Sequence, residues 1–337
     1  MTTIPKVRYG IIGFGRFAER AILPAIRLSA NSEVVAIQKR SLRAALERAA
    51  ALGVPRAYDT PEAMAADPAV DAVFIVSANA AHHDETLAAA RVGKHVLVEK
   101  PIAMDAREAL AMMRACAEHG VQLTVGHMVR LSPAVRRVRD LIRQGTLGAV
   151  NHASAEFVYD ARLSHRSWLT DRRVAGGGPV YDIGVHCLDT LRFILDDEVV
   201  SVRSELSPAP TAERTELTAA ILLRFGRGTI GSIYCSFASP VRRSLLEVTG
   251  TEGKITVQDF TLSETAVTLT LTLGPAGQSP VTTTEVIQVP NLYVDEVTRF
   301  SDCILTGAES FSPGRNGLLN QRVLDCVMVG GGTPATD

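Results

Sequence analysis

The sequence predicts an α/β protein with an N-terminal parallel sheet followed by a second, mainly antiparallel sheet. In the first 125 residues, short apolar runs alternate with Ala-rich helical stretches, a pattern typical of a parallel sheet with helices on both faces. From about residue 150, strand-like runs follow one another and are joined by Gly-bearing turns, which favours antiparallel pairing. The 337 residues are too many for one average core, so we expect two domains, 1–125 and 126–337.

The elements of the first domain follow from its apolar runs and from its helix-start signals. Thr60 and Pro61 form such a signal, a capping residue followed by a proline in the first turn, and they predict a short helix within 59–67. Longer helices are expected at about 15–29, 41–52, 80–92 and 105–118. The strands are expected at 7–12, 33–38, 71–76, 95–98 and 121–125.

The second domain is predicted to consist mostly of strands, with three helices. Helical patterns occur near 178–195, 291–306 and 313–328. Strands are expected at 149–159, 216–225, 229–237, 243–250, 253–258, 266–273 and 284–289. In the run 266–273, Thr alternates with apolar residues, which indicates that part of this sheet faces water.

The composition excludes several functional classes. The net charge of −1 provides neither a basic surface for nucleic acid nor a strong attraction to an anionic membrane. The five cysteines are scattered without a CxxC pair, which argues against a disulfide framework or a zinc ribbon, and we expect no metal. We see no signal peptide and no apolar run long enough to span a bilayer, so we expect a cytoplasmic protein.

A glycine-rich turn follows the first strand. Gly13, Gly15 and Ala18 form a GxGxxA string that ends a strand and opens a helix, with Phe14, Arg16 and Phe17 in the intervening positions. Glycines at these places permit a tight turn and let backbone N–H groups approach a pyrophosphate. In this context the string predicts a dinucleotide site, although a glycine-rich turn can also be purely structural.

The end of the second strand bears on which dinucleotide is bound. An acid is expected there when the ribose 2′-hydroxyl of NAD is held, but this strand ends in Gln38, Lys39 and Arg40. Two cations suit the 2′-phosphate of NADP, so NADP is favoured and NAD remains possible. The alternative is that Lys39 and Arg40 are solvated loop charges.

Two further stretches carry groups suited to proton transfer. A buried strand ends in Glu99, Lys100 and Pro101, and charges at such an edge are costly unless they pair or act on something. Asp182 and His186 stand four apart on a predicted helix and so share one face. Histidine exchanges a proton near neutral pH, a carboxylate can orient it, and a lysine can stabilise an alkoxide.

These groups together suit the oxidation of a secondary alcohol, with hydride passing to nicotinamide. The alternative interpretation is an ordinary Asp–His pair on an exposed helix and a lysine at a strand end. Asp189 also lies on the His186 side, either as a second partner or as a helix-surface acid.

The chain resembles the glucose–fructose oxidoreductase/inositol dehydrogenase (Gfo/Idh/MocA) family over nearly its whole length. The stretches that carry the resemblance are "GIIGFGRFA", "SANAAHHDETLAAARVGKHVLVEKPIA", "GVQLTVGH", "AGGGPVYDIGVHCLDTLRFIL" and "VTGTEGKI". The resemblance implies a Rossmann domain and a C-terminal α+β substrate-binding and oligomerisation domain built on a large, open, mainly antiparallel sheet. It also implies that Lys100 is the catalytic lysine, that Asp182 and His186 are the family's Asp-x-x-x-His pair, and that Glu99 faces the nicotinamide.

Other residues are matched to the family less closely. Ser77, Asn79 and His82 take the place of the family's Thr-Pro-Asn and His after the fourth strand, without the proline. After "VG", where many relatives have an Asn and two arginines, this chain has His127 and Met128 and retains only Arg130. Trp168 and Tyr293 match aromatic residues that lie at the nicotinamide or reach the site in relatives, and Tyr159, His165 and Arg166 are pocket-lining candidates.

The resemblance therefore implies an NAD(P)-dependent oxidoreductase, NADP-preferring, that interconverts a secondary hydroxyl and a ketone on a sugar, cyclitol or related polyol. Its partners are expected to be a small carbohydrate or polyol and further copies of itself, as a homodimer or homotetramer formed through the C-terminal sheet. Two alternatives stay open at this point. One is a non-catalytic dinucleotide-binding sensor or regulator, and the other is a reductase of a dihydrodiol, an imine or a nucleotide-linked sugar.

Overall fold

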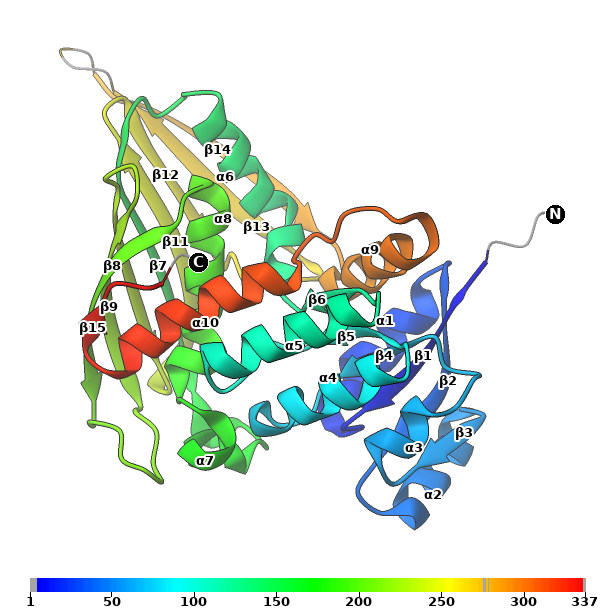
Figure 1. Cartoon of the computed structure of the whole chain (residues 1–337). Coiled ribbons are helices and arrows are strands. Elements are labelled where there is room, and N and C mark those ends of the chain that lie inside the picture. Colours follow the sequence, from blue (N-terminus) through cyan, green and yellow to red (C-terminus); the bar gives the residue numbers. More distant parts are fainter. Residues whose placement is uncertain (1–4, 275–276, 278, 336–337) are drawn as a thin grey trace. The chain divides into compact units, whose positions relative to one another are not determined.

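The computed structural model of the chain describes residues 5–274, 277 and 279–335 (Figure 1). The chain forms two compact units. Unit 1 consists of residues 1–127 and 293–321, and unit 2 of residues 128–292 and 322–337.

Unit 1 is built on a six-stranded sheet in the order β3-β2-β1-β4-β5-β6, in which every pair is parallel. This is the strand order of a Rossmann fold, so the fold class predicted for the N-terminal part is confirmed. The strands are β1 (Val7–Ile12), β2 (Ser32–Gln38), β3 (Arg56–Tyr58), β4 (Ala72–Ile75), β5 (His95–Val98) and β6 (Leu123–Val125).

Helices cover both faces of this sheet because its strands are apolar on both sides. One core joins the sheet to α4 (His82–Arg91) and α5 (Ala106–Glu118), and a second joins it to α1 (Leu23–Leu28) and α9 (Leu292–Thr306). The remaining helical elements of this unit are η1 (Ala18–Ile22), α2 (Leu42–Leu52), α3 (Pro61–Ala65), η2 (Asn79–Ala81) and the first part of α10 (Gly314–Met328).

The segment 293–321 is where the structure departs from the domain boundaries expected from the sequence. We expected it in the C-terminal domain, but it packs with the N-terminal sheet in unit 1. The side chains of Val297 and Phe300 on α9 are fully buried in the second core, and the Tyr9 hydroxyl on β1 lies 2.7 Å from the Ser301 hydroxyl. A helix's apolar face shows that it is buried but does not show which sheet buries it.

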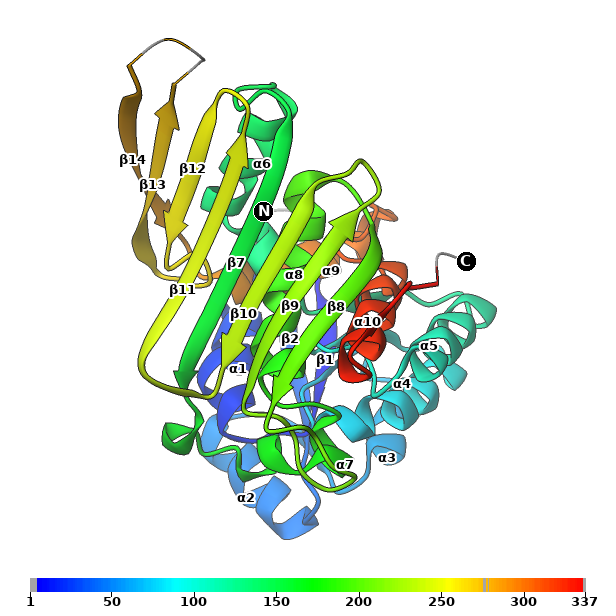
Figure 2. The same cartoon turned by 90° about the vertical axis from the view of Figure 1, so that its left-hand side faces the viewer.

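Unit 2 is built on a nine-stranded sheet in the order β14-β13-β12-β11-β7-β10-β9-β8-β15 (Figure 2). Its pairs are antiparallel except for β10 with β7, so the predicted mainly antiparallel sheet is confirmed. The strands are β7 (Val150–Asp160), β8 (Val199–Ser207), β9 (Thr218–Phe225), β10 (Ile230–Ser236), β11 (Ala238–Gly250), β12 (Gly253–Gln258), β13 (Thr265–Leu273), β14 (Val281–Val289) and β15 (Gly331–Gly332).

Two helices of unit 2, α6 (Pro133–Arg143) and α8 (Val185–Leu195), lie against the same face of this sheet, and Figure 2 looks onto the opposite face. α8 contacts β7 and β10 and continues directly from η6 (Val180–Gly184). The short elements η3 (Met128–Leu131), η4 (Ala161–Leu163), η5 (Ser167–Thr170) and α7 (Arg172–Ala175) complete this unit.

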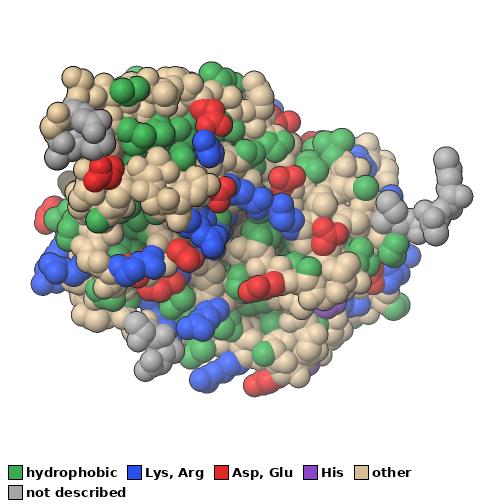
Figure 3. Space-filling model, turned by 90° about the horizontal axis from the view of Figure 1, so that it is seen from above, with side chains coloured by type: hydrophobic (Ala, Val, Ile, Leu, Met, Phe, Trp, Pro, Cys, Tyr) green, Lys and Arg blue, Asp and Glu red, His purple; other side chains and the backbone are tan. Residues whose placement is uncertain are grey.

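Three strands were not predicted. β3 has only three residues and β15 only two, and β8 was missed because its polar residues alternate with only a few apolar ones. None of the helices in the part of the chain that the structure describes is long and apolar enough to cross a membrane. On the face shown in Figure 3, acidic and basic side chains are interspersed with hydrophobic ones, in keeping with the net charge of −1.

Candidate active site

The glycine-rich turn lies at the carboxyl end of β1. Gly13 has a φ of +76°, and a Cβ added there would lie 2.6 Å from Cα of Ser77, so the fold itself requires glycine at this position. At Gly15 an added Cβ would have only the Gly13 carbonyl oxygen near it, 3.7 Å away. The turn therefore has open space at Gly15, as the approach of a dinucleotide pyrophosphate requires, and its residues fit that group.

Gln38, at the end of β2, supports this turn from the side. Its Oε1 accepts the Gly13 N–H at 3.0 Å, its backbone carbonyl accepts the Phe14 N–H at 2.9 Å, and its Nε2 donates to the Asp59 carbonyl at 2.8 Å. The Lys39 ammonium donates to the Phe14 carbonyl at 2.7 Å, whereas Arg40 is exposed. The structural role of Gln38 was not foreseen from the sequence.

The loop after β4 lies against the turn through Ser77. The Ser77 hydroxyl donates to Oε2 of Glu85 on α4 at 2.5 Å. Burial raises the pKa of Glu85 to about 7, more than the hydrogen bond from Ser77 lowers it, and the charges of Glu62 and Asp84 add to the increase.

His82 is fully buried at the start of α4. Its Nδ1 lies 2.9 Å from the Pro101 carbonyl oxygen and its Nε2 lies 3.4 Å from that of Ser77. Burial lowers the pKa of His82 to about 4, so the ring is neutral near pH 7. The ring thus joins the loop after β4 to the segment that carries Lys100. Nearby Asn79 is also buried, in η2.

Glu99 and Lys100 follow β5 at the carboxyl edge of the sheet, and both are half-buried. The backbone N–H of Glu99 donates to the Ile75 carbonyl at 2.9 Å, which extends the pairing of β5 with β4 by one residue. Oε2 of Glu99 accepts the Lys100 N–H at 3.2 Å. The carboxylate thereby holds the peptide from which the lysine side chain extends.

Tyr293, a predicted site residue of unit 1, contacts the glycine-rich turn. Tyr293, in the first turn of α9, packs edge-on against Phe17, with ring centroids 5.6 Å apart and an angle of 71° between the rings. Arg16 and Phe17 are exposed residues of the turn. The structure therefore gathers the turn, the Ser77 loop, Glu99–Lys100 and Tyr293 at the carboxyl edge of one sheet, where α/β proteins bind ligands.

In unit 2, the glycine triplet at 176–178 precedes the helix that carries Asp182 and His186. An added Cβ at Gly178 would lie 2.2 Å from the Glu216 carbonyl oxygen, so only glycine fits there. The Glu216 carboxylate is fully buried, and its Oε1 accepts the N–H groups of Gly178 at 2.8 Å and Val180 at 3.1 Å. Burial raises the pKa of Glu216. The sequence carries no signal for this role.

Asp182 is buried and held by two side chains from outside its own helix. Arg166 binds it through two hydrogen bonds, Nη1 to Oδ1 and Nη2 to Oδ2, each 2.8 Å long. The Tyr159 hydroxyl donates to Oδ2 at 2.9 Å, and the tyrosine's pKa is raised by burial and by the charge of Asp182. Tyr159 and Arg166 therefore belong to this cluster, whereas His165 is exposed.

His186 is 8% exposed and its ring lies 6.5 Å from that of Phe157, with an angle of 41° between them. Asp182 is 6% exposed, so the interpretation of Asp182 and His186 as an exposed helix pair is wrong. Asp189 is also buried, at 1%, and accepts from Nε of Arg130 at 2.6 Å, so it is not a helix-surface acid.

Two other predicted residues have different surroundings. Trp168 is half-buried in η5, next to the buried Leu169. His127 is buried in unit 1, where its Nε2 lies 3.1 Å from the side-chain nitrogen of Asn320 on α10. Among the residues that the structure describes, no cluster of three or more His, Cys, Asp or Glu side chains is arranged to hold a metal ion.

Comparison with known proteins decides the family. Residues 7–127 match the domain described as "Oxidoreductase family, NAD-binding Rossmann fold", and residues 135–256 match the "GFO/IDH/MocA C-terminal domain". This chain belongs to the Gfo/Idh/MocA oxidoreductase family. It is therefore an NAD(P)-binding oxidoreductase, and the resemblance found in the sequence is confirmed.

Members of the Gfo/Idh/MocA family align with the chain over nearly its whole length. A 1,5-anhydro-D-fructose reductase of Ensifer adhaerens is 32% identical, with 92% of each chain covered. A D-xylose 1-dehydrogenase [NADP(+)] of Haloarcula marismortui is 29% identical, over 98% of this chain and 92% of its own. The crystal structure of an aldose-aldose oxidoreductase from Caulobacter crescentus, complexed with glycerol, is 26% identical, with a TM-score of 0.86 over 97% of this chain and 99% of its own.

Proposed function

We propose that this protein is an NADP-preferring oxidoreductase that interconverts a secondary hydroxyl and a ketone on a sugar, cyclitol or related polyol by hydride transfer. The observation that carries the proposal is the burial of Asp182 and His186 on one helix, with both oxygens of Asp182 fixed by Arg166. A fixed carboxylate beside a histidine suits proton transfer. The printed names of the relatives, an anhydrofructose reductase and a xylose dehydrogenase, support the substrate class.

In this proposal the protein's own residues move the proton. When bound, the nicotinamide cofactor accepts or supplies the hydride. His186 takes the hydroxyl proton during oxidation and returns it during reduction, and Asp182 orients the ring and stabilises its cation. The Lys100 ammonium stabilises the alkoxide.

We further assign cofactor binding to the carboxyl edge of the unit 1 sheet, together with Trp168. The preference for NADP is supported by Gln38, whose amide is occupied in the turn and offers no carboxylate to a ribose hydroxyl. Arg40 is exposed at the end of β2, where it suits a 2′-phosphate, and Lys39 stands beside it. The proposed cofactor contacts are Gly13, Phe14, Gly15, Arg16, Phe17, Lys39, Arg40, Ser77, Asn79, His82, Glu99, Lys100, Trp168 and Tyr293.

The first test is a fluorescence titration with NADPH and NADH at matched concentrations. Trp168 is the one tryptophan in the sequence, so quenching or energy transfer should report binding. Tighter binding of NADPH, weakened by Arg40→Ala and unaffected by the remote Arg27→Ala, is the expected result. Equal or tighter binding of NADH would reverse the assigned preference, and no binding of either would remove the proposal.

The second test concerns the proton-transfer residues. Lys100→Met and His186→Asn should each lower kcat with xylose or an anhydroketose by about a hundredfold or more, because general acid–base catalysis contributes that much. The affinity for NADPH should stay nearly unchanged in His186→Asn, and in Lys100→Met, which also removes a proposed cofactor contact, it should change far less than kcat. Full activity in either variant would overturn the assignment.

The same assays separate the alternatives. A regulator would bind the dinucleotide but turn over no substrate in any panel, whereas a reductase of another class would act on a trans-dihydrodiol, an imine or a nucleotide-linked sugar and not on free polyols. Lys100, Asp182 and His186 together favour the enzyme, because a sensor needs no acid–base group.

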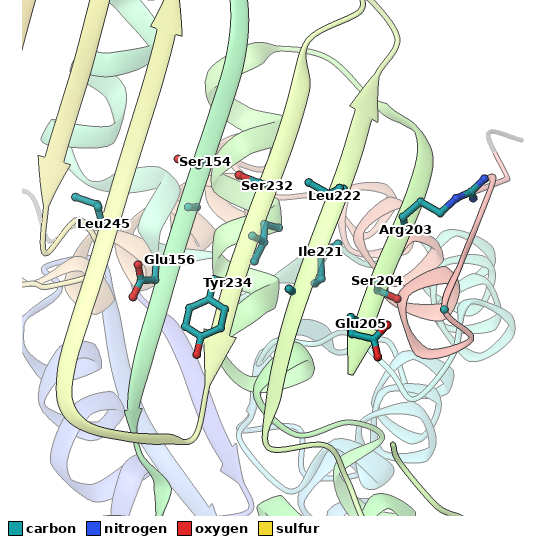
Figure 4. Close-up of a pocket in the computed structure, with 14 residues that line it drawn as sticks. Ser154, Glu156, Arg203, Ser204, Glu205, Ile221, Leu222, Ser232, Tyr234 and Leu245 are labelled. Atoms are coloured by element: carbon teal, nitrogen blue, oxygen red, sulfur yellow. The ribbon is translucent and has the colours of Figure 1, made fainter. Parts of the chain in front are cut away.

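We also propose that the open face of the unit 2 sheet joins copies of the chain into a dimer or tetramer. A groove of about 590 Å³ runs across this face (Figure 4). Leu222 on β9 and Tyr234 on β10 are large side chains in it, 58% and 44% exposed, and an exposed apolar patch is typical of an interface. Leu222→Arg should produce a monomer by light scattering, and Leu28→Arg, which changes an exposed apolar residue on α1 of unit 1, should not. An unchanged assembly in Leu222→Arg would argue against this face.

We also propose that the protein is located in the cytoplasm. Its five cysteines are thiols in the structure, four of them buried, which suits a reducing compartment. Fractionation of cells that produce the tagged chain would test this.

A further inference from the structure

One buried acid in unit 1 has no part in the function proposed above. Glu296 lies on α9, three residues after Tyr293 and so on the same face of the helix. Its side chain is fully buried. Tyr293 contacts Phe17 in the glycine-rich turn, so the first turns of α9 bring a carboxyl group to the edge of the sheet where the proposed cofactor residues gather.

Gly126 fixes where this carboxyl lies. Gly126 follows β6, and its N–H donates to the Val98 carbonyl of β5 at 2.8 Å. A Cβ added to Gly126 would lie 3.5 Å from Oε1 of Glu296 and 3.4 Å from Cα of Glu99. The carboxyl of Glu296 and the backbone of Glu99 are thus both close to Gly126. Glu296 therefore lies directly beside the strand end that carries Lys100.

The surroundings of Glu296 are unfavourable for a negative charge. Neither of its carboxyl oxygens has a hydrogen-bond partner among the described residues. The titratable groups that face it are Glu99, at the end of β5, and Tyr9, on β1, and the Tyr9 hydroxyl is itself bonded to Ser301. Burial first, and the charge of Glu99 second, raise the pKa of Glu296 well above its usual range.

We propose that Glu296 is a positioning residue that acts through its proton: it stays a neutral acid, so that Glu99 remains ionised beside Lys100. This inference rests on the proposed function, in which Lys100 is catalytic. A fully buried carboxyl and a half-buried one beside it cannot both ionise readily, so a charge on Glu296 would favour protonation of Glu99. Protonated Glu99 is a weaker acceptor for the backbone N–H of Lys100, so it holds the peptide that carries the lysine side chain less firmly.

Infrared spectroscopy tests the proton without reference to turnover. At pH 7 the NADPH-bound protein should show a carboxylic-acid C=O contribution that Glu296→Gln loses, in addition to any from Glu85, whose pKa is about 7, and from Glu216, whose pKa is raised by burial. The control is Glu33→Gln, which removes an exposed carboxylate at the start of β2 and should leave the acid band in place. An acid band of equal strength in Glu296→Gln would overturn the proposal, whether or not the protein turns over a sugar.

Kinetics across pH test the consequence for Lys100. Glu296→Gln is permanently neutral, so at pH 7 its kcat should lie within about threefold of the native value, and its activity should extend to higher pH than that of the native enzyme. Glu296→Leu is also uncharged, so it should show the same extension of activity to higher pH, which a merely structural role of Glu296 would not produce. Thermal melting of each variant checks that it is folded.

Two kinetic results would overturn the inference. A hundredfold loss in Glu296→Gln would mean that the carboxyl must ionise or transfer its proton, and pH profiles of the Gln and Leu variants identical to that of the native enzyme would mean that Glu296 does not act on Lys100 through its proton. Failure of the proposed function is recognised separately, by an active Lys100→Met variant.

Discussion

The two glycine-rich segments of the molecule contain glycine for different physical reasons. In unit 2, Gly178 is required by the protein itself, because a Cβ would lie 2.2 Å from the Glu216 carbonyl oxygen. In unit 1, Gly13 is required in the same way by the backbone of Ser77, but Gly15 is not, because an added Cβ would find a single atom, at 3.7 Å. A glycine that the fold does not need, in a turn aimed at the ligand edge of a sheet, indicates that the ligand needs the space.

Because of this difference, we expect Gly178 to matter for the stability of the fold and Gly15 to matter for cofactor binding. The Gly178 segment is held by the buried carboxylate of Glu216 and in turn holds the helix of Asp182 and His186. The Gly15 segment is held two residues earlier, where the Gly13 N–H donates to Gln38, and Gly15 itself is left exposed. Substitutions at the two glycines should therefore affect different measurements.

The largest effect is expected for Gly178→Ala. The new methyl group overlaps the Glu216 carbonyl oxygen and the Thr215 hydroxyl, neither of which is the end of a flexible side chain. We expect a loss of about 3 kcal/mol in the free energy of unfolding, at the upper end of overpacking effects. Urea denaturation followed by circular dichroism measures it, and a stability equal to that of the native protein would show that this segment can shift without cost.

The next largest loss of stability is expected for substitutions of Glu216, and these substitutions test whether Glu216 holds the Gly178 segment in place. Glu216→Leu leaves the N–H groups of Gly178 and Val180 buried without an acceptor, which should cost about 2 kcal/mol. Glu216→Gln keeps an acceptor oxygen and carries no buried charge, so it should lose less than half of that. The same denaturation experiment compares them. If the two variants were equally stable, the hydrogen bonds to Glu216 would not be what anchors the helix.

The sequence predicted some parts of these two segments and not others. Gly13, Gly15, Lys100, Asp182 and His186 were found because each lies in a local string whose spacing has a chemical meaning. The partners that hold them were not found, because Gln38 is 25 residues from Gly13 and Glu216 is 38 from Gly178. Hydrogen bonds between distant residues depend on the tertiary fold, which no local pattern records.

The prediction of secondary structure from the sequence was limited in the same way, because local patterns do not show how elements pack. Strands such as β1 and β5, which contain apolar runs, were predicted with the bounds that the structure shows, whereas the short β3 and the polar β8 were missed. Helix α9 was predicted as a helix but assigned to the wrong partner sheet, because its apolar residues fit either core. Glu296 was overlooked for that reason, since its meaning depends on lying next to Glu99.

A smaller effect, dependent on pH, is expected at Glu85 beside the glycine-rich turn. Its pKa is about 7 in the folded protein and near 4.5 when unperturbed, so the folded state binds the proton more tightly. The stabilisation from this group is complete below about pH 4.5 and is lost as the pH rises through about 7. At pH 8, Glu85→Gln should therefore be more stable than the native protein by about 2 kcal/mol, and nearly equal at pH 5.

Denaturation at pH 5, 6, 7 and 8 measures this difference for the native protein and for Glu85→Gln. The control is Glu118→Gln, which removes an exposed carboxylate at the end of α5 and should leave the pH dependence of stability as it is in the native protein. Parallel stability curves for the native protein and Glu85→Gln would mean that Glu85 is ionised throughout this range and is compensated by its surroundings.

Gly15→Ala should have the smallest effect on stability and completes the comparison with Gly178→Ala. Its methyl group enters open space, so the free energy of unfolding should equal that of the native protein within about 0.5 kcal/mol. The Kd for NADPH, measured by Trp168 fluorescence, should rise about tenfold or more, because the methyl group occupies the space left for the pyrophosphate. A loss of stability equal to that of Gly178→Ala would erase the distinction between the two segments. Unchanged stability with unchanged affinity would mean that the pyrophosphate does not approach Gly15, and the cofactor would then have to bind elsewhere on the edge of the sheet.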